Sequence, residues 1–494
     1  MNRTIIKALP ILVLVLIILS MPKSGNANPA AATFIVDSNA DAGDWNPGDG
    51  ICETANGNHV CTLRAAVQEA NAAPGSTIIF GLAGSITYLL TSQVALNANM
   101  TIVGNGAANT IIDGNGSVTN NRVFTISSAP TVVSISGVTI RNGKSDLGGG
   151  IHNVGHLLLN NVIVMNNAAT IGNPRSGGGI WNSGALTITQ SLINGNTATI
   201  PFTGGGGGIY NTNGTVLLDH TSLNGNTTDF LGGAIQVDGG IVSLVNSAID
   251  SNTASMGGGI FNGGISSSGI LNITSSGIFS NTATSGSTGG GGIYNLWGTA
   301  TLVNSTLYLN VANNNGGGIY NDSSGTTGLY NVTIAGNYSD WDSNNTGTGG
   351  GISRQGGTVN VRNSIVAGNY DYSNACLTCS TADDCKGTIN SEDFNLVQTT
   401  SGCSLVGSTG NNITGVVPQL SYPPAYNGGS TLNLALQSTS QAIDAGNTGG
   451  CRDILGALIS VDQRGSRRPF PNGGRCDIGA FEFGNWIFLP LIMR

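Results

Sequence analysis

Two groups of residues combine acidic side chains with a spacing that acid–base chemistry could use. Asp219 directly precedes His220, and Asp340 and Asp342 flank Trp341 at positions i and i+2. Hydrolysis of a glycosidic bond uses two carboxyl groups about 5–9.5 Å apart. On stacked strands such a pair comes from neighbouring strands or from one face of a single strand. Asp219, His220, Asp340 and Asp342 are therefore the catalytic candidates.

Neither group completes an acid pair within the sequence. Asp340 and Asp342 lie in a long insertion, where isolated surface acids are common and usually solvated. No second acid occupies the position of Asp219 in neighbouring repeats. The residues found there are Asn160, Thr189, Val245 and Val303.

Basic residues are too few for a lyase that acts on acidic sugars. Such an enzyme needs a base for proton abstraction and cations that hold the substrate. Between positions 145 and 350 the sequence has a single Arg or Lys, Arg175, and Arg354 and Arg362 follow near the last repeats. The sequence therefore favours a protein without a catalytic site over a polysaccharide-degrading enzyme.

An oxygen-rich loop offers candidate calcium ligands. Asp44, Asn46 and Asp49 lie within six residues and resemble half of a Ca²⁺-binding loop. The loop lacks the spacing and the final Glu of an EF-hand. We expect a plain turn here, with Ca²⁺ as the alternative.

The cysteines have an even count and avoid the repetitive middle of the chain. Four of them form a cluster that could be interpreted as a zinc site, but two disulfides are the better interpretation in an exported chain. The eight cysteines are Cys52, Cys61, Cys376, Cys379, Cys385, Cys403, Cys451 and Cys476.

A column of aromatic residues recurs at one strand position and is the candidate binding surface. If these rings point outward, they could stack on sugars, and if they point inward, they belong to the core. The residues are Trp181, Tyr210, Phe261, Tyr294 and Tyr320.

A repeated Gly-Gly-Gly-Ile-x-Asn unit positions these candidates. A second element, of the type Asn-Ser-x-Ile-x-x-Asn, accompanies each glycine block, and a short alternating strand lies between the two. The spacing of 25 to 33 residues is typical of solenoids, and a β-propeller would need about 40 residues per blade. The repeat isoleucines lie at 151, 180, 209, 235, 260, 293, 319 and 352.

Three short strands per coil predict an all-β, right-handed parallel β-helix. Stacked coils would lie about 4.8 Å apart and would bury Ile, Leu and Val in continuous columns. Asparagine at a turn can adopt left-handed geometry and hydrogen-bond to the next coil. The expected turn ladder comprises Asn161, Asn246, Asn304, Asn331 and Asn363, with Gln190 and His220 as substitutes.

The N-terminal flank predicts a cap on the solenoid. Leu63, Ala66, Val67 and Ala70 form one face of a short helix, and a disulfide between Cys52 and Cys61 would close a loop beside it. A cap covers the apolar columns and unpaired strand edges that an open solenoid end would expose.

The flanks resemble two families of exported bacterial proteins. Cys61, Leu63, Arg64 and Ala66 match the motif of the CSLREA domain, whereas Thr62 and Ala65 depart from it. Asp462-Gln-Arg-Gly and the segment from Cys476 to Glu482 resemble the choice-of-anchor Q domain. The repeats themselves resemble those of polymorphic outer-membrane proteins. These resemblances imply a secreted or cell-surface β-helix and say little about chemistry.

The N-terminus predicts export. Arg3 and Lys7 precede a short apolar stretch typical of a signal peptide, with cleavage after Ala27 or within residues 30–32; an uncleaved anchor is the alternative. Cleavage removes only basic residues from a chain that already has 17 Lys and Arg against 25 Asp and Glu. Because no basic patch remains, we expect no nucleic-acid partner.

The predicted organisation has six parts. These are a signal peptide (1–27), an N-terminal cap with the first coils (28–125), β-helix repeats (126–370), a Cys-rich insertion (371–410), a choice-of-anchor-Q-like region (411–484) and an apolar tail (485–494).

The tail is too short to span a bilayer and would be a docked strand or a sorting signal. The chain also lacks room for the C-terminal membrane barrel of an autotransporter. We therefore predict a non-catalytic adhesive, glycan-binding or structural module without a transmembrane span in the mature chain. Its partners would be polysaccharide or cell-envelope components.

Overall fold

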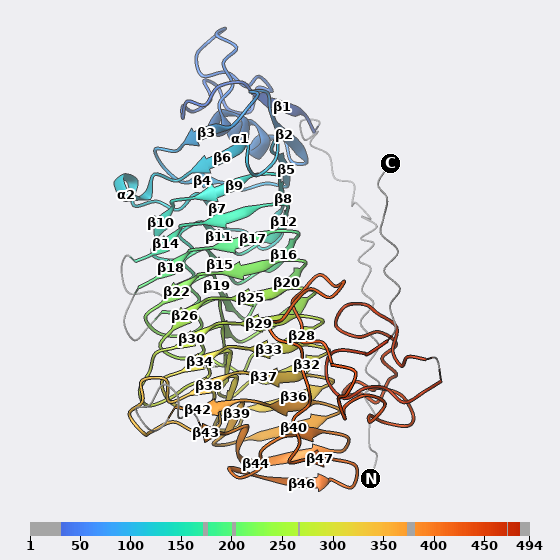
Figure 1. Cartoon of the computed structure of the whole chain (residues 1–494). Helices are drawn as coiled ribbons and strands as arrows, with labels where there is room; N and C mark the ends of the chain where they lie inside the picture. Colours follow the sequence, from blue (N-terminus) through green and yellow to red (C-terminus); the bar gives the residue numbers. More distant parts are fainter. Residues whose placement is uncertain are drawn as a thin grey trace, which may run out of the picture.

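The computed structural model of the protein describes residues 31–170, 176–199, 204–264, 267–372, 381–471 and 473–484. Within them the chain forms the expected right-handed parallel β-helix, whose coils stack along the vertical axis of Figure 1. No helix in this part of the chain is long and apolar enough to cross a membrane. The signal peptide, Arg175, Cys376, Cys379 and the apolar tail lie outside the described residues.

Each full coil crosses four faces in chain order, which we name the glycine, long, middle and short faces. The first three are the strands that the repeats predict. The fourth consists of two-residue strands, which are too short to give an alternating pattern in the sequence.

Most strands of the glycine face carry the Ile-x-Asn motif, and those of the long face mostly have five residues. The glycine face comprises β4 (Val94–Ala95), β7 (Phe124–Ile126), β11 (Ile151–Asn153), β15 (Ile180–Asn182), β19 (Ile209–Thr212), β23 (Ile235–Asp238), β27 (Ile260–Asn262), β31 (Ile293–Asn295), β35 (Ile319–Asn321) and β39 (Ile352–Arg354). The long face comprises β1 (Thr33–Val36), β2 (Ser76–Phe80), β5 (Met100–Val103), β8 (Val132–Ser136), β12 (His156–Asn160), β16 (Ala185–Thr189), β20 (Thr215–Asp219), β24 (Ile241–Val245), β28 (Ile270–Thr274), β32 (Thr299–Val303), β36 (Thr326–Tyr330), β40 (Thr358–Arg362), β44 (Cys385–Glu392) and β46 (Cys403–Ser408).

The middle and short faces complete each coil. The middle face comprises β3 (Ile86–Leu89), β6 (Thr110–Asp113), β9 (Thr139–Arg141), β13 (Ile163–Met165), β17 (Leu192–Asn194), β21 (Ser222–Asn224), β25 (Ala248–Asp250), β29 (Gly277–Phe279), β33 (Thr306–Tyr308), β37 (Thr333–Ala335), β41 (Ile365–Ala367), β45 (Leu396–Val397) and β47 (Ile413–Thr414). The short face comprises β10 (Lys144–Ser145), β14 (Ala168–Ala169), β18 (Thr197–Ala198), β22 (Thr227–Thr228), β26 (Thr253–Ala254), β30 (Thr282–Ala283), β34 (Val311–Ala312), β38 (Tyr338–Ser339), β42 (Tyr370–Asp371) and β43 (Thr381–Ala382).

Neighbouring coils stack residue on residue. Every repeat isoleucine pairs with the next one, as Ile151 does with Ile180, and all eight are at most 1% exposed. The apolar interior is therefore a set of continuous columns, as the period-2 pattern predicts.

A buried ladder of asparagine amides follows the corner between the middle and short faces. In each coil the Nδ2 of one asparagine donates to the Oδ1 of the next at 2.9–3.0 Å. The last amide donates to Asp384, where burial raises the pKa to about 6. The members of the ladder are Asn167, Asn196, Asn226, Asn252, Asn281, Asn310, Asn337 and Asn369.

The turn column predicted to form such a ladder behaves differently. All seven of its residues have the expected left-handed φ, between +46° and +57°. Within the described residues, only Asn363 donates to another member, Asn331. The ladder prediction was therefore wrong for this corner, because most of these side chains point away from the neighbouring coil toward solvent or toward the C-terminal region.

The N-terminal cap is present. The helix α1 (Leu63–Ala72) begins at Thr62, whose side chain accepts the backbone N–H of Ala65, and it packs at the upper end of the solenoid in Figure 1. Its four predicted apolar residues are buried, and Cys52 is bonded to Cys61. A second, four-residue helix, α2 (Gly116–Thr119), lies beside β10.

The solenoid extends beyond the predicted end of its repeats. From residue 381 on, the segment predicted as a Cys-rich insertion supplies β43 to β46, and Cys385 is bonded to Cys403 across β44 and β46. This bond contradicts the four-cysteine zinc interpretation. These coils were not predicted because they lack the Gly-Gly-Gly-Ile motif.

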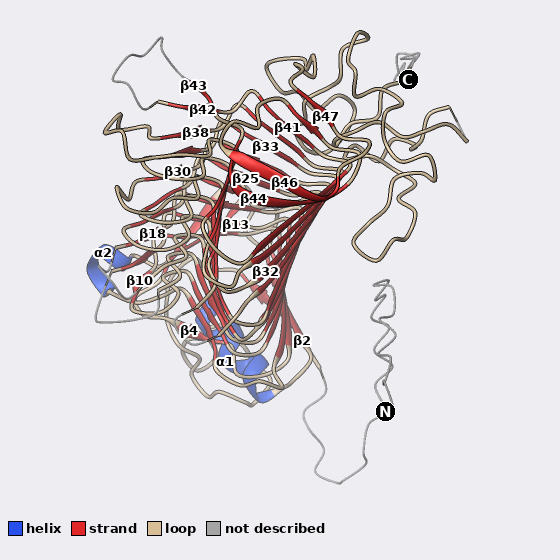
Figure 2. Cartoon of the chain, turned by 90° about the horizontal axis from the view of Figure 1, so that it is seen from below, coloured by secondary structure: helices blue, strands red, loops and turns tan. Residues whose placement is uncertain are grey.

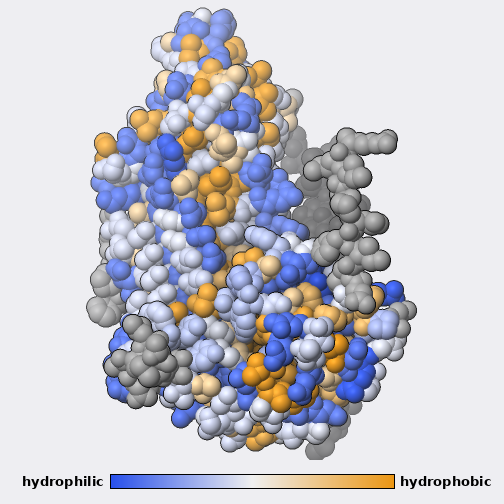
Figure 3. All heavy atoms as spheres, in the orientation of Figure 1, coloured by the Kyte–Doolittle hydropathy of each residue, from blue (hydrophilic) through white to orange (hydrophobic). Residues whose placement is uncertain are grey.

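The C-terminal region, residues 415–484, folds back along the side of the solenoid (Figures 1 and 2). Leu420, Leu434 and Leu436 pack on the outer surface of the middle face. Cys451 is bonded to Cys476 within this region. Apolar residues gather in the lower right part of Figure 3, where this region lies, and Leu455 and Leu458 are 69% and 66% exposed.

Replacing one ladder asparagine tests its role. We expect Asn252→Ala to lower the free energy of unfolding by about 3 kcal/mol, because it leaves buried donors on Asn226 without their acceptor. Urea unfolding followed by circular dichroism measures this change. The control, Asn224→Ala, removes one long, partly exposed hydrogen bond in the preceding coil and should cost less than about 1 kcal/mol. Equal losses in the two variants would contradict the assignment.

Candidate functional site

Four of the five residues in the predicted aromatic column are buried and are not available to a ligand. Tyr210, Phe261, Tyr294 and Tyr320 point away from the solenoid interior, but they are only 2–5% exposed. Loop residues cover them and form a separate apolar cluster with Phe261, Tyr294 and Tyr320: Phe230, Leu231, Met256 and Leu296.

Hydroxyl groups of this column are also occupied. Tyr210 donates to Asp238, and Tyr294 donates to Asp322 at 3.2 Å. Trp181, at the upper end, stacks on His152 with ring centroids 4.6 Å apart. The sequence could not show this burial, because the covering loops have no fixed length or motif.

The Asp340 and Asp342 pair does not form a catalytic arrangement. Asp340 is fully buried and accepts the backbone N–H groups of Asn344 and Asn345, so it closes its own loop. Asp342 instead accepts the side-chain amide of Asn344 at the surface. The two carboxylates therefore have separate structural partners.

The oxygen-rich loop folds over the cap helix. Carboxylate oxygens of Asp44, Asp49 and Glu69 lie within 4.8 Å of one another, and Glu69 was not recognised from the sequence. Glu69 is buried and accepts the N–H groups of two loop glycines, while Asn46 donates to both aspartates. Burial, together with these two neighbouring acids, raises the pKa of Glu69. This hydrogen bonding fits the expected turn, and Ca²⁺ binding stays a prediction.

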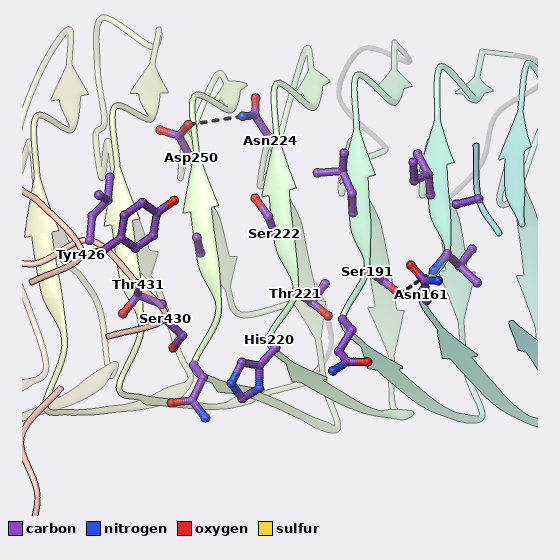
Figure 4. Close-up of a pocket in the computed structure, with 18 of the residues that line it drawn as sticks. Asn161, Ser191, His220, Thr221, Ser222, Asn224, Asp250, Tyr426, Ser430 and Thr431 are labelled. Carbon is purple, nitrogen blue, oxygen red and sulfur yellow. Dashed lines mark hydrogen bonds between the residues drawn. The ribbon is translucent and has the colours of Figure 1, made fainter. Parts of the chain in front are cut away.

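A large cavity lies between the middle face and the C-terminal region. We call it the polar cavity; its volume is about 780 Å³. Its floor is the outer surface of β13, β17, β21 and β25, and Tyr426, Ser430 and Thr431 approach from the C-terminal region (Figure 4). The turn column supplies Asn161, Gln190, His220 and Asn246 to one wall.

Amides and hydroxyls line this cavity beside apolar side chains such as Ile163, Leu192 and Phe279. Among its described lining residues there is no Lys or Arg, and Asp250 is the one carboxylate. Asn224 donates to Asp250 at 3.3 Å, and burial raises the pKa of Asp250. Such a lining can hydrogen-bond to a neutral, hydroxyl-rich molecule but offers no cation to an acidic one.

The candidates Asp219 and His220 lie at the edge of this cavity. His220 Nδ1 is 2.7 Å from an Asp219 carboxylate oxygen, and both side chains are about half exposed. Figure 4 places His220 and Asp250 at opposite ends of the floor. Among the described residues that line the cavity, no second acid faces the Asp219–His220 pair, as paired-carboxylate hydrolysis would need.

A second cavity, of about 450 Å³, lies farther along the solenoid. We call it the aromatic cavity, and four tyrosines line it: Tyr308, Tyr338, Tyr370 and Tyr422. Tyr338 and Tyr370 come from adjacent short-face strands and stack with centroids 5.7 Å apart. Tyr422, from the C-terminal region, is 52% exposed and faces Tyr308 at 5.8 Å.

Glycine is required where Tyr308 crosses the corner. A Cβ added to Gly336 would lie 2.6 Å from the Tyr308 ring, and Gly336 has a φ of +63°. Burial raises the pKa of Tyr308 and of Tyr338. Trp341 and Tyr372 extend the aromatic surface beside Tyr338.

The sequence did not reveal this aromatic cavity. Tyr338 and Tyr370 occupy equivalent positions one coil apart, and this spacing could have identified them as neighbours. The two-residue strands that carry them, however, had no recognisable pattern. Tyr422 comes from the C-terminal region, and its approach to the corner depends on tertiary packing.

A buried network of charges holds the C-terminal region against the solenoid. Arg468 forms a fully buried ion pair with Glu482 at 3.0 Å and donates to Asn304 of the turn column. Asn363 donates to the backbone carbonyl of Asp477 at 2.7 Å. These contacts hold residues 468–482 against the turn column of the solenoid.

No family model matches the chain, and no curated protein matches it. A solved structure described as pectate lyase Pel9A aligns over 92% of this chain and 97% of its own, with 14% identity and a TM-score of 0.38.

Asp477 should make the docking of this region pH-dependent. Burial, and the nearby Glu482, raise its pKa to about 7, above the usual value of about 3.9. The folded state therefore binds the Asp477 proton more tightly than the unfolded state does. The resulting stabilisation of the folded state is present at low pH and is lost as pH rises through about 7.

Comparing wild type with Asp477→Asn isolates this effect. We expect the stability of wild type relative to the variant to rise by about 1–3 kcal/mol between pH 8 and pH 5, measured by thermal unfolding. The comparison cancels His152, whose pKa burial lowers to about 4 and which acts in the opposite direction. A pH-independent difference would show that Asp477 titrates normally.

Proposed function

We propose that this chain is an exported or cell-surface β-helix protein that binds neutral polysaccharide without cleaving it. The aromatic cavity is the observation that carries this proposal. Tyrosine rings combine a flat apolar surface with a hydroxyl group, and this combination suits the alternating apolar and polar surfaces of a sugar ring.

The chemistry of the two cavities supports a neutral ligand. Among their described lining residues there is no Lys or Arg, and the chain is acidic overall. An anionic polymer would therefore meet no counter-charge and a repulsive net field.

The proposed location rests on the flanks of the chain. The three disulfides within the described part of the chain fit an oxidising compartment, and the predicted signal peptide would deliver the protein there. The resemblances to the CSLREA and choice-of-anchor Q domains belong to this proposal. They favour a position at the cell envelope, with envelope polysaccharide as one class of partner.

A polysaccharide-degrading enzyme is the second candidate. The Asp219–His220 pair and the partly buried Asp250 at the polar cavity favour it. The spacing of these groups across the floor and the lack of a second facing acid argue against it.

Binding to a panel of neutral glucans, xylans and mannans, with polygalacturonate as the acidic comparison, tests the main proposal. We expect mature residues 28–494 to bind at least one neutral polymer. We also expect Tyr370→Ala to weaken that binding roughly tenfold, the equivalent of about 1.4 kcal/mol of lost stacking. Affinity electrophoresis and calorimetry provide the measurements.

The matched control is Trp297→Ala, which removes an exposed aromatic ring that lines neither cavity. Equal loss of binding in the two variants, or preference for polygalacturonate, would refute the proposed site.

A depolymerisation assay on the same panel separates the two candidate functions. We expect no new reducing ends or unsaturated products. Turnover that is lost in Asp250→Asn or His220→Ala would replace the binding proposal with the enzymatic one.

A further inference from the structure

The polar and aromatic cavities follow one another along the solenoid axis. Phe279 lines the polar cavity and Tyr308 lines the aromatic one, and these two residues are register neighbours on β29 and β33. The same stretch of the C-terminal region, residues 417–432, supplies the second wall of both. The two cavities are therefore adjacent, and both lie between the solenoid and residues 417–432.

We propose that a single linear glycan occupies both cavities at once and lies parallel to the solenoid axis. This inference rests on the proposed polysaccharide binding and adds the direction, length and polarity of the bound chain. One part of the chain would stack on Tyr338, Tyr370 and Tyr422, and the rest would hydrogen-bond along the polar floor.

The repeating fold presents similar groups at regular intervals along this path. Asn161, Gln190, His220 and Asn246 come from four consecutive coils, and coils are separated by about 4.8 Å. Middle-face residues Asn224 and Asp250 continue the polar lining toward the aromatic end. A periodic row of amides suits a polymer of repeating hydroxyl-bearing units better than a single compact molecule.

The length of this path sets the size of ligand that can use it. Asn161 lies in the first and Tyr370 in the last of eight consecutive coils. The steps between these coils, at the normal interstrand spacing, give a path of roughly 34 Å. A short oligosaccharide can occupy only one cavity. A longer oligosaccharide that is already bound in one cavity binds the other cavity intramolecularly, and this raises its overall affinity.

The two ends of the path differ in what they contribute. Stacking on aromatic rings supplies most of the affinity, because amide hydrogen bonds to a sugar replace equivalent bonds to water. The aromatic cavity should therefore bind short fragments by itself, whereas the polar cavity should be detectable only with long ones.

Calorimetric titration of the mature protein with cello-, xylo- and manno-oligosaccharides of increasing length tests this inference. We expect octasaccharides to bind at least about tenfold more tightly than tetrasaccharides of the same series. The double variant Gln190→Ala/Asn224→Ala should reduce octasaccharide affinity to the tetrasaccharide level and leave tetrasaccharide binding unchanged. Tyr370→Ala should weaken both.

The control is Asn272→Ala, which removes a partly exposed amide from the long face and should change neither affinity. Circular dichroism verifies that each variant is folded. Affinity that is independent of length, or octasaccharide binding that is unaffected by the double variant, would overturn the shared path while leaving polysaccharide binding at the aromatic cavity intact. Failure of every length to bind would overturn both proposals.

Discussion

Stacking of one coil on the next in constant register is the constraint on which the rest of this structure depends. Backbone hydrogen bonds between parallel strands provide the stacking, and the buried asparagine ladder holds the corner between the middle and short faces. A slip of one residue would move every isoleucine out of the interior and every ladder amide away from its acceptor. Because the register is constant, side chains at one position of the repeat form a column along the surface of the solenoid.

The turn column shows how one repeated position acquires two uses. In the upper coils Asn161, Gln190 and His220 stay exposed and form a wall of the polar cavity. In the lower coils Asn304 and Asn363 are buried and bind the C-terminal region instead. The docked region thus divides a uniform column into a binding part and an anchoring part.

Much of the fold was predictable from the sequence because its determinants are local. The repeat length, the columns of isoleucine, the cap helix and the Cys52–Cys61 bond all follow from residues close together in the chain. The last coils were missed because β44 and β46 lack the glycine motif.

The candidate site was much less predictable, because it depends on tertiary packing. The aromatic residues singled out from the repeats lie under loops, so their periodicity identified a structural cluster. The tyrosines that do form a cavity combine two-residue strands with a distant segment that contains Tyr422. Similarly, Asp250 and His220 line one cavity, at opposite ends of its floor, only through the register of neighbouring coils and the docking of residues 426–432.

The C-terminal region is therefore as important to the proposed function as the solenoid. Its buried ion pairs, Arg468 with Glu482 and Arg464 with Asp462, help to fix the C-terminal region beside the solenoid. Binding groups on both sides are held in position before a ligand arrives, which lowers the entropic cost of association.

A crystal structure of the mature protein with a neutral oligosaccharide tests the central claim most directly. We expect sugar rings packed against Tyr338, Tyr370 and Tyr422, with the uncleaved oligosaccharide continuing toward Asn224. A ligand bound outside the two cavities, or a cleaved product beside Asp250 and His220, would contradict it.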